Sequence, residues 1–438
     1  GPGGTLFWAG GRRSISIFAG GNVGTFIPIV VLVVVFLLIA VRKVGNTSLC
    51  IWQVVLSGAA AVLVAGAITP ADALLSINPD VMLFLFFMFV IGEALAESGY
   101  LYHLSYRLFS RAESVRHLVV LILVGGGILS ALLMNDTLAV VGTPLMLYFA
   151  RRHGISAKLL LLSLAFAITT GSVVSPIGNP QNLLIALSGG IGNPFVTFPL
   201  YLAVPTAISL LLAYIFLRRA FPGEFHRDPL VHRKEEIRDP ALAALARLSL
   251  VLLVLLIAAK VAAAVLVPDI EFRLTWIAVV AAMPVLIGSS RRFELVRRID
   301  WATLVFFAGL FVLMASVWQS GFFQPLIEES SLDLAAVPVI MAMSVVVSQF
   351  VSNVPFVALS LPVLAHLGTS TTGMMALAAG STIAGNMLIL GAASNVIVIQ
   401  GAERGGETLT FGEFARVGVP LTVAQAAVYV LYLALFPA

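Results

Sequence analysis

Apolar runs of about 15–25 residues recur along the chain, and this is the length of a helix that crosses a lipid bilayer. They lie near residues 26–41, 51–69, 81–96, 196–218, 248–266, 274–290, 302–318 and 417–436. Hydrophobic residues make up 60% of the chain and charged residues 11%, whereas a soluble protein is roughly half apolar and a quarter charged. The sequence therefore predicts an all-α polytopic membrane protein and excludes a large soluble enzyme.

Few residues are available for metal or redox chemistry. The single cysteine, Cys50, excludes an intrachain disulfide, a multi-cysteine zinc site and an iron–sulfur cluster. The six histidines show no ligand spacing, so we expect no metal site and no cofactor. The net charge of +4 could suit nucleic acid, but basic cytoplasmic loops explain it more simply. We therefore expect the lipid bilayer as a partner and no nucleic acid.

The basic residues gather on one side of the predicted spans. If Arg42 and Lys43 are placed inside and the spans alternate, the inside segments are 42–50, 97–116, 151–158, 218–247, 291–298 and 403–416. These segments hold 21 of the 25 lysine and arginine residues, the exceptions being Arg12, Arg13, Lys260 and Arg273. Because cytoplasmic loops carry such an excess, the pattern predicts a multi-pass plasma-membrane protein with a cytoplasmic central linker.

This alternation requires two segments to enter and leave on the same side. Residues 117–150 are flanked by arginines at both ends, and 34 residues are too few for two spans of about 20. A helical hairpin that reaches mid-membrane, with its tip near Asn135, fits better. The same reasoning predicts a hairpin from the opposite side at 335–367, with its tip near Asn353. Such tips must be buried in protein or line a polar cavity.

The two halves of the chain resemble each other in order and spacing. In the first half, Asn135-Asp136-Thr137 is followed by Thr143-Pro144-Leu145, and in the second half Asn353-Val354-Pro355 is followed by Leu361-Pro362-Val363. Further along, Gly178-Asn179-Pro180-Gln181-Asn182 in the first half corresponds to Gly391-Ala392-Ala393-Ser394-Asn395 in the second. Each half has three spans, a re-entrant hairpin, an interrupted helix and a last span. The sidedness gives the halves opposite orientations, and such an inverted repeat indicates a secondary transporter with its site between the repeats.

The predicted organisation follows from this repeat. It comprises an N-terminal tail at 1–25, a first repeat at 26–218 with a hairpin at 117–150 and an interrupted helix at 157–190, a linker at 219–247, and a second repeat at 248–438 with a hairpin at 335–367 and an interrupted helix at 372–400.

Polar residues within these apolar segments are the candidate site. Hairpin tips and helix breaks expose free N–H groups, which suit an anion, and free carbonyls, which together with an Asn oxygen suit Na⁺. The candidates are Asn135, Asp136, Thr137, Gly178, Asn179, Asn182, Ser352, Asn353, Ser394 and Asn395. At the interrupted helices, two prolines and a glycine disrupt helical hydrogen bonding in the first half, whereas the second break contains no proline.

Three ionisable residues fall at membrane depth, where a charge costs about 2.5–3.5 kcal/mol on insertion scales. Asp136 lies at the first hairpin tip and is the best candidate for coupling transport to a proton or a cation. Its counterpart in the second half is Val354, so any coupling is asymmetric. Glu93 and Lys260 lie toward the ends of their spans and are more simply interfacial.

Four motifs together resemble one family. They read NDTLAVVGTPLML from 135, SPIGNPQNLLI from 175, SNVPFVALSLPVL from 352 and AGNMLILGAASNVIVIQGAE from 384. This pattern is similar to the ion transporter superfamily. It most resembles the arsenite permease branch, which includes the melanosomal P protein and bacterial anion permeases, and is more distantly similar to the divalent anion/sodium symporters. The resemblance covers residues 26–436.

The resemblance implies a homodimer with a scaffold and a mobile transport domain that moves as an elevator. The symporters' tips read Ser-Asn-Thr. Here the tips are Met134-Asn135-Asp136 and Ser352-Asn353-Val354, which keep the Asn but not both flanking hydroxyls. This departure leaves room for proton coupling through Asp136. The arsenite permeases of this family include some that work with a separate ATPase subunit.

We therefore expect a secondary active transporter of a small anion, either an oxyanion such as arsenite or a carboxylate, coupled to H⁺ or Na⁺, and not an enzyme. One alternative is a Na⁺/H⁺ antiporter of the same superfamily with Asp136 as the exchanging carboxylate. An alternative from another class is an ion channel, since intramolecular repeats also suit a pore.

Overall fold

The computed structural model describes residues 23–41, 43–44, 47–48, 51–109, 111–225, 239–266, 273–322, 325 and 333–436. Almost all of the expected N-terminal tail, and residues 226–238 of the expected linker, lie outside these ranges. The protein is a helical polytopic membrane protein, as its sequence predicts, and its described strands are one pair of two residues each. Six described helices are long and apolar enough to cross a membrane.

The first half contains the following elements: α1 (Val23–Val41), β1 (Lys43–Val44), β2 (Thr47–Ser48), α2 (Ile51–Val64), α3 (Pro70–Ser76), α4 (Pro79–Glu97), α5 (Tyr100–Phe109), α6 (Val115–Leu121), the π-helix η1 (Ile122–Gly126), α7 (Gly127–Leu132), α8 (Asn135–His153), α9 (Ala157–Ser172), α10 (Pro180–Ser188) and α11 (Pro194–Ala220). The two short strands pair with each other in an antiparallel turn. The 3₁₀ turn η2 (Pro222–Glu224) follows α11.

The second half repeats this order. Its elements are α12 (Pro240–Leu266), α13 (Leu274–Gly288), α14 (Arg292–Arg298), α15 (Trp301–Gln319), α17 (Val337–Val351), α18 (Asn353–His366), α19 (Thr371–Ile383), the 3₁₀ turns η3 (Ala384–Asn386) and η4 (Ile389–Gly391), α20 (Ala393–Arg404) and α21 (Phe411–Leu433). The helices α4 and α15 both have 19 residues, and α3 and α14 both have 7.

Packing between the halves follows the same correspondence. Helix α2 of the first half packs against α15 of the second. Their counterparts in the other half, α13 and α4, also pack against each other. Helix α8 packs against α20, and α18 packs against α10. Reciprocal contacts of this kind are what a pseudo-two-fold axis between two repeats produces. The chain is therefore built from two inverted repeats whose elements interlock rather than stack as separate domains.

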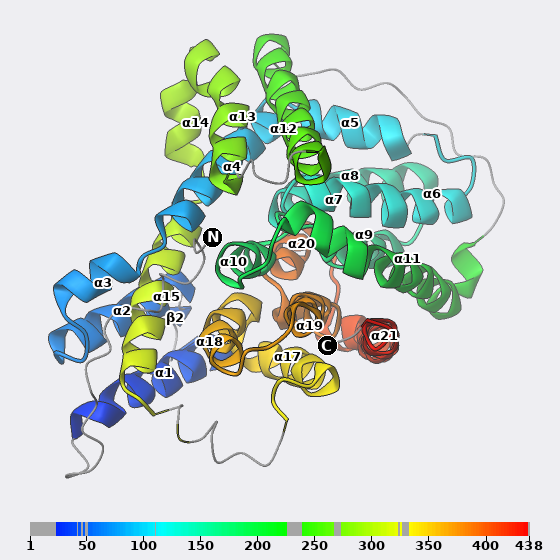
Figure 1. The fold of residues 1–438 in the computed structure, drawn as a ribbon. Helices are drawn as coiled ribbons and strands as arrows, with labels where there is room; N and C mark the ends of the chain where they lie inside the picture. Colours follow the sequence, from blue (N-terminus) through cyan, green and yellow to red (C-terminus); the bar gives the residue numbers. More distant parts are fainter. Residues whose placement is uncertain are drawn as a thin grey trace.

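The helices form two groups. Helices α6–α11 and α17–α21 make up a set that we call the hairpin bundle, and α1–α4 with α12–α15 make up the flanking helices. Figure 1 shows α1, α2, α3 and α15 together at one side and α6, α9, α11 and α21 at the opposite side, with α10 and α20 between them. Helix α4 contacts both α8 and α10, so it borders the bundle.

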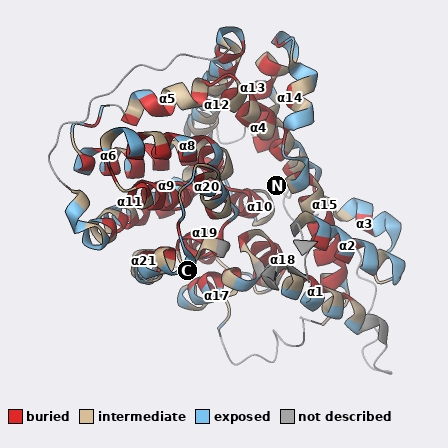
Figure 2. Ribbon diagram, turned by 180° about the vertical axis from the view of Figure 1, so that it is seen from behind, coloured by how far each residue is buried: buried red, intermediate tan, exposed pale blue. Residues whose placement is uncertain are grey.

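Two helices occupy the centre of the hairpin bundle. Every residue of α9 except Lys158 is buried, and α19 is buried from Thr372 onward. By contrast, α11 and α12 expose large apolar side chains, including Leu211 and Leu255 (Figure 2). A helix that is apolar on its exposed face is suited to hydrocarbon rather than water. Because α9 and α19 are the first segments of the two interrupted helices, these helices lie at the centre of the bundle.

The first hairpin spans residues 115–153 and is longer at both ends than its predicted range of 117–150. Its first arm contains a glycine-rich π-turn, η1, which runs directly into α7. A Cβ atom on Gly171 of α9 would lie 2.2 Å from the Cα atom of Gly127, so the two backbones approach closely because both residues are glycine. Ser130 of the same arm donates a hydrogen bond to the carbonyl of Ile168 at 2.6 Å. These contacts fix the arm against α9.

The tip of this hairpin ends inside the protein. The backbone N–H of Asn135, the first residue of α8, donates to the carbonyl oxygen of Gly178 at 3.0 Å. Gly178 lies in the break between α9 and α10. Because the tip meets the interruption of another helix, irregular backbone at that depth is covered by protein, as a re-entrant hairpin requires.

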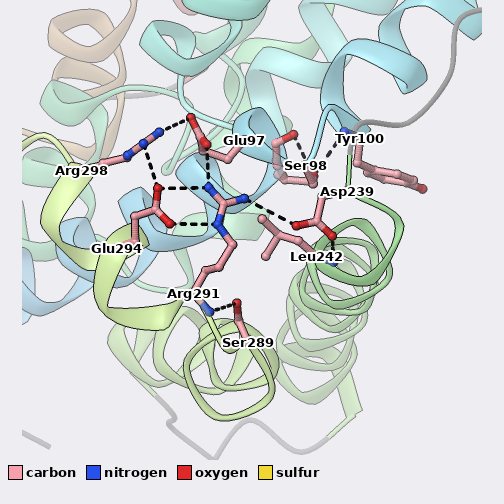
Figure 3. Close-up of polar contacts among 10 residues, drawn as sticks. Glu97, Ser98, Tyr100, Asp239, Leu242, Ser289, Arg291, Glu294 and Arg298 are labelled. Carbon is pink, nitrogen blue, oxygen red and sulfur yellow. Dashed lines mark hydrogen bonds and ion pairs between the residues drawn. The ribbon is translucent and has the colours of Figure 1, made fainter.

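Charged residues join three of the flanking helices at the predicted cytoplasmic side (Figure 3). Arg291, just before α14, contacts Glu97 of α4 at 3.2 Å, Asp239 before α12 at 3.5 Å and Glu294 at 2.9 Å. Arg298 contacts Glu97 at 2.7 Å and Glu294 at 2.8 Å. The hydrogen bonds from Arg291 lower the pKa of Glu294, and the same carboxylate raises the pKa of Arg291. The cluster ties the ends of these helices together.

Candidate functional site

Asparagine side chains lie at equivalent places in the two hairpin tips. Asn135 begins α8 and Asn353 begins α18, and each is only 5% exposed. The side-chain oxygen Oδ1 of each is buried and accepts no hydrogen bond from any described residue. A buried carbonyl-type oxygen without a partner is costly, and such groups in native structures call for an explanation such as a bound ion or ligand. The two predicted tip asparagines therefore offer matched acceptor atoms that no described residue uses.

The second tip has a strained backbone. Ser352, the residue before α18, has φ of +75°, a conformation that residues with a Cβ atom rarely adopt. Backbone strain of this kind is found at functional sites, where surrounding structure imposes it. Gln349 of α17 holds this arm, because its Nε2 donates to the carbonyl of Ala384 at 2.9 Å. Each hairpin is thus hydrogen-bonded to the break in its own half.

The break in the first interrupted helix is well satisfied. Asn179 caps α10, accepting from the Asn182 N–H at 2.8 Å, and its Nδ2 donates to Ser172 Oγ at 2.9 Å. The Nδ2 of Asn182 donates to the carbonyls of Ser172, Val173 and Ser175 at 3.1, 3.3 and 3.0 Å. Both asparagines therefore replace helical hydrogen bonds that the prolines and the turn remove.

Gly178 is required at this break. A Cβ atom there would lie 2.6 Å from the carbonyl oxygen of Ser172. Its own carbonyl accepts the hydrogen bond from Asn135, so the residue contacts both the break and the hairpin tip. This double contact explains why the predicted site motif contains a glycine at 178.

The break in the second interrupted helix follows the same plan with fewer bonds. Asn395 Nδ2 donates to the carbonyl of Gly385 at 2.5 Å, ten residues earlier in the chain, just as Asn182 reaches back ten residues to Ser172. The Asn395 Oδ1 and the hydroxyl of the neighbouring Ser394 are buried with no partner among the described residues. The second break therefore leaves polar atoms open that the first break uses internally.

Hydrogen bonds across the repeats join the two breaks, and sequence reasoning missed three residues that take part in them, Thr170, Thr382 and Gln425. Thr382 of α19 accepts from Asn179 Nδ2 at 3.2 Å and donates to Asn182 Oδ1 at 3.2 Å. In the opposite direction, Thr170 of α9 accepts from Asn386 at 2.9 Å and from Gln425 of α21 at 3.2 Å. The signal that could have identified them is their polarity within otherwise apolar helices.

Asp136 and Thr137 follow Asn135 in the first turn of α8, and both are half-buried. Asp136 forms no hydrogen bond or ion pair with any residue in the described part of the chain. Thr137 faces a flanking helix, because a Cβ atom on Gly92 of α4 would lie 3.1 Å from the Thr137 Oγ1. The acid therefore lies beside the tip, at the border between the hairpin bundle and α4.

The remaining ionisable residues do not join this site. Glu93 is half-buried on α4, on the side of Glu97 and Arg298, and Lys260 lies on α12. Among the described residues, no group of three or more His, Cys, Asp or Glu side chains is arranged to hold a metal ion. The site is thus built from amide and hydroxyl groups with one carboxyl group.

Comparison with known proteins identifies the family. The sequence pattern of the citrate transporter (CitMHS) family matches residues 34–373. The chain belongs to the citrate transporter family. Its sequence is 30% identical to an uncharacterized transporter of Mycobacterium tuberculosis over 430 residues, which cover 93% of this chain and 97% of that protein.

Other similar proteins extend the comparison, and they include the P protein, which the sequence motifs also resemble. The silicon efflux transporter LSI3 of Oryza sativa subsp. japonica is 27% identical over 85% of this chain and 90% of its own length. The P protein of Homo sapiens is 34% identical over 38% of this chain and 22% of its length. The crystal structure of the YdaH transporter of Alcanivorax borkumensis has the same fold, with a TM-score of 0.59 and 15% identity over 94% of this chain and 98% of that one.

Proposed function

We propose that this family member is a secondary active transporter that moves a small anion, an oxyanion or a carboxylate, across the membrane in exchange with or together with H⁺ or Na⁺. The observation that carries the proposal is the pair of buried, unpartnered Oδ1 atoms of Asn135 and Asn353 at matched hairpin tips. Oxygen ligands of this type suit Na⁺, and the N–H groups at the starts of α8 and α18 suit an anion.

The rest of the predicted site divides into two roles. Asn179, Asn182 and Gly178 are engaged in internal hydrogen bonds, so we assign them to shaping the break. The groups with free polar atoms or partial exposure contact the substrate or the ion: Asn135, Asp136, Thr137, Ser352, Asn353, Ser394 and Asn395. Asp136 is the coupling residue in this proposal, because a carboxyl group without a partner at membrane depth can bind and release a proton or Na⁺.

An elevator motion is the mechanism that we propose. Hydrogen bonds of Thr382 and Thr170 join the two breaks, and those of Asn135 and Gln349 join each hairpin to its break, so that they form one unit. At the border with the flanking helices, α4 approaches α8 closely because residue 92 is glycine, whose Cβ atom would lie 3.1 Å from Thr137 Oγ1. Movement of the hairpin bundle past the flanking helices would carry the site from one side of the membrane to the other. We further propose a homodimer in the plasma membrane, with room for a separate ATPase subunit.

Transport by purified protein in liposomes tests this proposal. Uptake of labelled citrate, arsenite, phosphate and sulfate is measured under a Na⁺ gradient, under a pH gradient and with neither. We expect saturable uptake of one of these anions that depends on one gradient. Asn135→Ala and Asn353→Ala should each abolish most of that uptake, whereas Ser360→Ala, in the middle of α18, should not. Uptake by both asparagine variants at the wild-type rate would refute the site assignment.

The rival functions give different results in the same vesicles. A change of internal pH that is driven by a Na⁺ gradient without any anion would indicate a Na⁺/H⁺ antiporter. Flux that never saturates and shows no counterflow would indicate a channel. The unpartnered Asp136 is compatible with the antiporter, whereas the helix N-termini at both tips favour a transported anion.

A further inference from the structure

A cleft separate from the hairpin tips lies along helix α8. It has a volume of about 780 Å³ and is bordered by α8 on one side and by α20 with its following turn on the other. The residues that matter for its chemistry are Thr143, Arg151 and Arg152 from the first half and Gln400 and Gly401 from the second. Its arginine end belongs to the segment that the charge distribution places in the cytoplasm.

The cleft leads toward the proposed transport site. On α8, Arg151, Leu147, Thr143 and Val140 follow one another at intervals of three or four residues, and the next position on that face is Asp136. On α20, Gly401 and Ile397 lie on the same face as Ser394. These two lining faces therefore connect the cytoplasmic arginines with the carboxyl group and hydroxyl of the site.

Helices α8 and α20 touch within the cleft. A Cβ atom on Gly401 would lie 2.9 Å from Cγ2 of Thr143, so the two helices approach closely there because residue 401 is glycine. Arg151 lies 15 residues from Asp136 along α8, which is about 22 Å at 1.5 Å per residue, so a ligand held by the arginines is distinct from one at the tips.

The two arginines at the cleft carry positive charge without an ion-pair partner in the described ranges. The guanidinium of Arg151 donates to the carbonyl oxygen of Gly405, which carries no net charge. Within the part of the chain that the structure describes, Arg152 makes no hydrogen bond, and neither arginine makes an ion pair. None of the residues that line the cleft is acidic. This contrasts with Arg291, which contacts three carboxylates.

We propose that this cleft is a second anion site on the cytoplasmic side. There, Arg151 and Arg152 bind a small anion that has two or more carboxylate or oxyanion groups. The inference rests on the proposed anion transport and adds to it a charge requirement for the substrate. Guanidinium groups bind such anions through paired hydrogen bonds, and a positively lined cleft raises the local anion concentration. An anion bound there then moves along the cleft, past Val140 and Ile397, toward the hairpin tips.

Protection of an introduced thiol tests occupancy of the cleft without requiring transport. The native chain has one cysteine, so Cys50→Ser with Gln400→Cys gives a single thiol at the cleft. The full-length protein is placed in nanodiscs of phosphatidylcholine, and its reaction with a charged methanethiosulfonate reagent is followed with and without citrate. We expect citrate to slow the reaction, and Arg152→Gln to raise the citrate concentration needed by about threefold to tenfold. Arg219→Gln, in the exposed arginine pair at the end of α11, should change nothing.

Three results of this experiment would overturn the second anion site. The first is a reaction rate that neither citrate nor inorganic phosphate changes. The second is protection that Arg152→Gln leaves unaltered. The third is slowing by phosphatidylglycerol in the nanodisc with no further effect of citrate, because the cleft would then hold a lipid headgroup instead of the substrate.

Transport kinetics separate this inference from the proposed function. With anion supplied on the cytoplasmic side, Arg152→Gln should raise KM by about threefold to tenfold and leave kcat within about twofold, with a smaller salt dependence than wild type. Equal KM values for the variant and wild type would refute the second anion site while the proposed function stands. Citrate protection in a protein that transports no anion would refute the proposed function while the second site stands.

Discussion

The two halves of the chain share one plan but use their polar groups differently. At the first break, Asn179 and Asn182 satisfy each other, the neighbouring carbonyls and Thr382. At the second break, Ser394 and Asn395 keep polar atoms without partners among the described residues. The tips differ too, since Asp136 stands where the second half has Val354. The two halves therefore share a backbone plan, but the first break uses its polar groups internally and the second leaves some of them without described partners.

The largest expected effect tests the difference between the tips. Asp136→Asn removes the only carboxyl group at either tip, and we expect gradient-driven anion uptake to fall by about 10-fold to 100-fold, as loss of a charged interaction worth about 1.5–3 kcal/mol would produce. Proton movement coupled to the anion should be lost as well. Uptake of labelled anion and a pH-sensitive dye inside the same liposomes measure both quantities.

The matched control for Asp136→Asn is Val354→Asn at the equivalent position of the second tip. It should retain proton coupling because Asp136 is still present. If Asp136→Asn kept wild-type coupling, or if Val354→Asn alone abolished it, the assigned asymmetry between the tips would be wrong.

The breaks differ in what each asparagine contributes to stability. Asn182→Ala removes three hydrogen bonds to buried carbonyls, so we expect a loss of about 2–3 kcal/mol in the free energy of unfolding. Asn395→Ala removes one such bond, and we expect a loss of about 1 kcal/mol together with a severe loss of transport. Thermal unfolding in detergent and uptake in liposomes, measured on both variants, provide the comparison. An Asn395→Ala protein that transports normally would contradict the division into support and ligand.

Strain at the second tip gives a smaller effect of opposite sign. Ser352→Gly lets the left-handed φ of +75° be adopted without a clash, and we expect a gain of up to about 1 kcal/mol in stability with slower transport. Ser360→Gly, inside α18, should instead lose about 1 kcal/mol, because glycine is a poor helix former. A lower unfolding temperature for Ser352→Gly than for wild type would show that the tip conformation carries no strain.

The fold could be predicted from the sequence because apolar length, basic loops and paired motifs act together. These signals located both hairpins and both interruptions, and they identified Asn135 and Asn353 at the tips. The first hairpin extends to 115–153 because Ser114 caps its first helix and Gly154, with φ of +64°, ends its last one. Such caps lie outside the apolar run, so the run alone places the helix ends only to within a few residues.

The division of roles at the site could not be predicted in the same way. Asn179, Asn182 and Asn395 are all asparagines next to a helix break, and only their contacts tell support from open ligand. Thr170, Thr382 and Gln425 gave no motif, because a single polar residue in an apolar helix does not indicate which partner it will meet. The cleft at Arg151 and Arg152 was hidden for a related reason, since basic residues at a helix end already had a topological explanation.

The smallest expected effect concerns the charged cluster around Arg291. Its carboxylates form ion pairs, whereas Asp136 at the candidate site forms none with the described residues. Arg291 holds the pKa of Glu294 below its ordinary value of 4.5. A carboxyl group with a lowered pKa in the folded state adds stability that is complete above its ordinary pKa and is lost as the pH falls through the lowered value. Glu294→Gln should therefore lower the unfolding temperature slightly near neutral pH, and the difference from wild type should vanish in acid. Thermal unfolding of both proteins from about pH 7 to pH 3 measures this. The exposed Glu113, which makes no ion pair with other described residues, supplies the control Glu113→Gln. A difference for Glu294→Gln that stays constant down to the lowest pH would mean that its side chain acts through packing rather than charge.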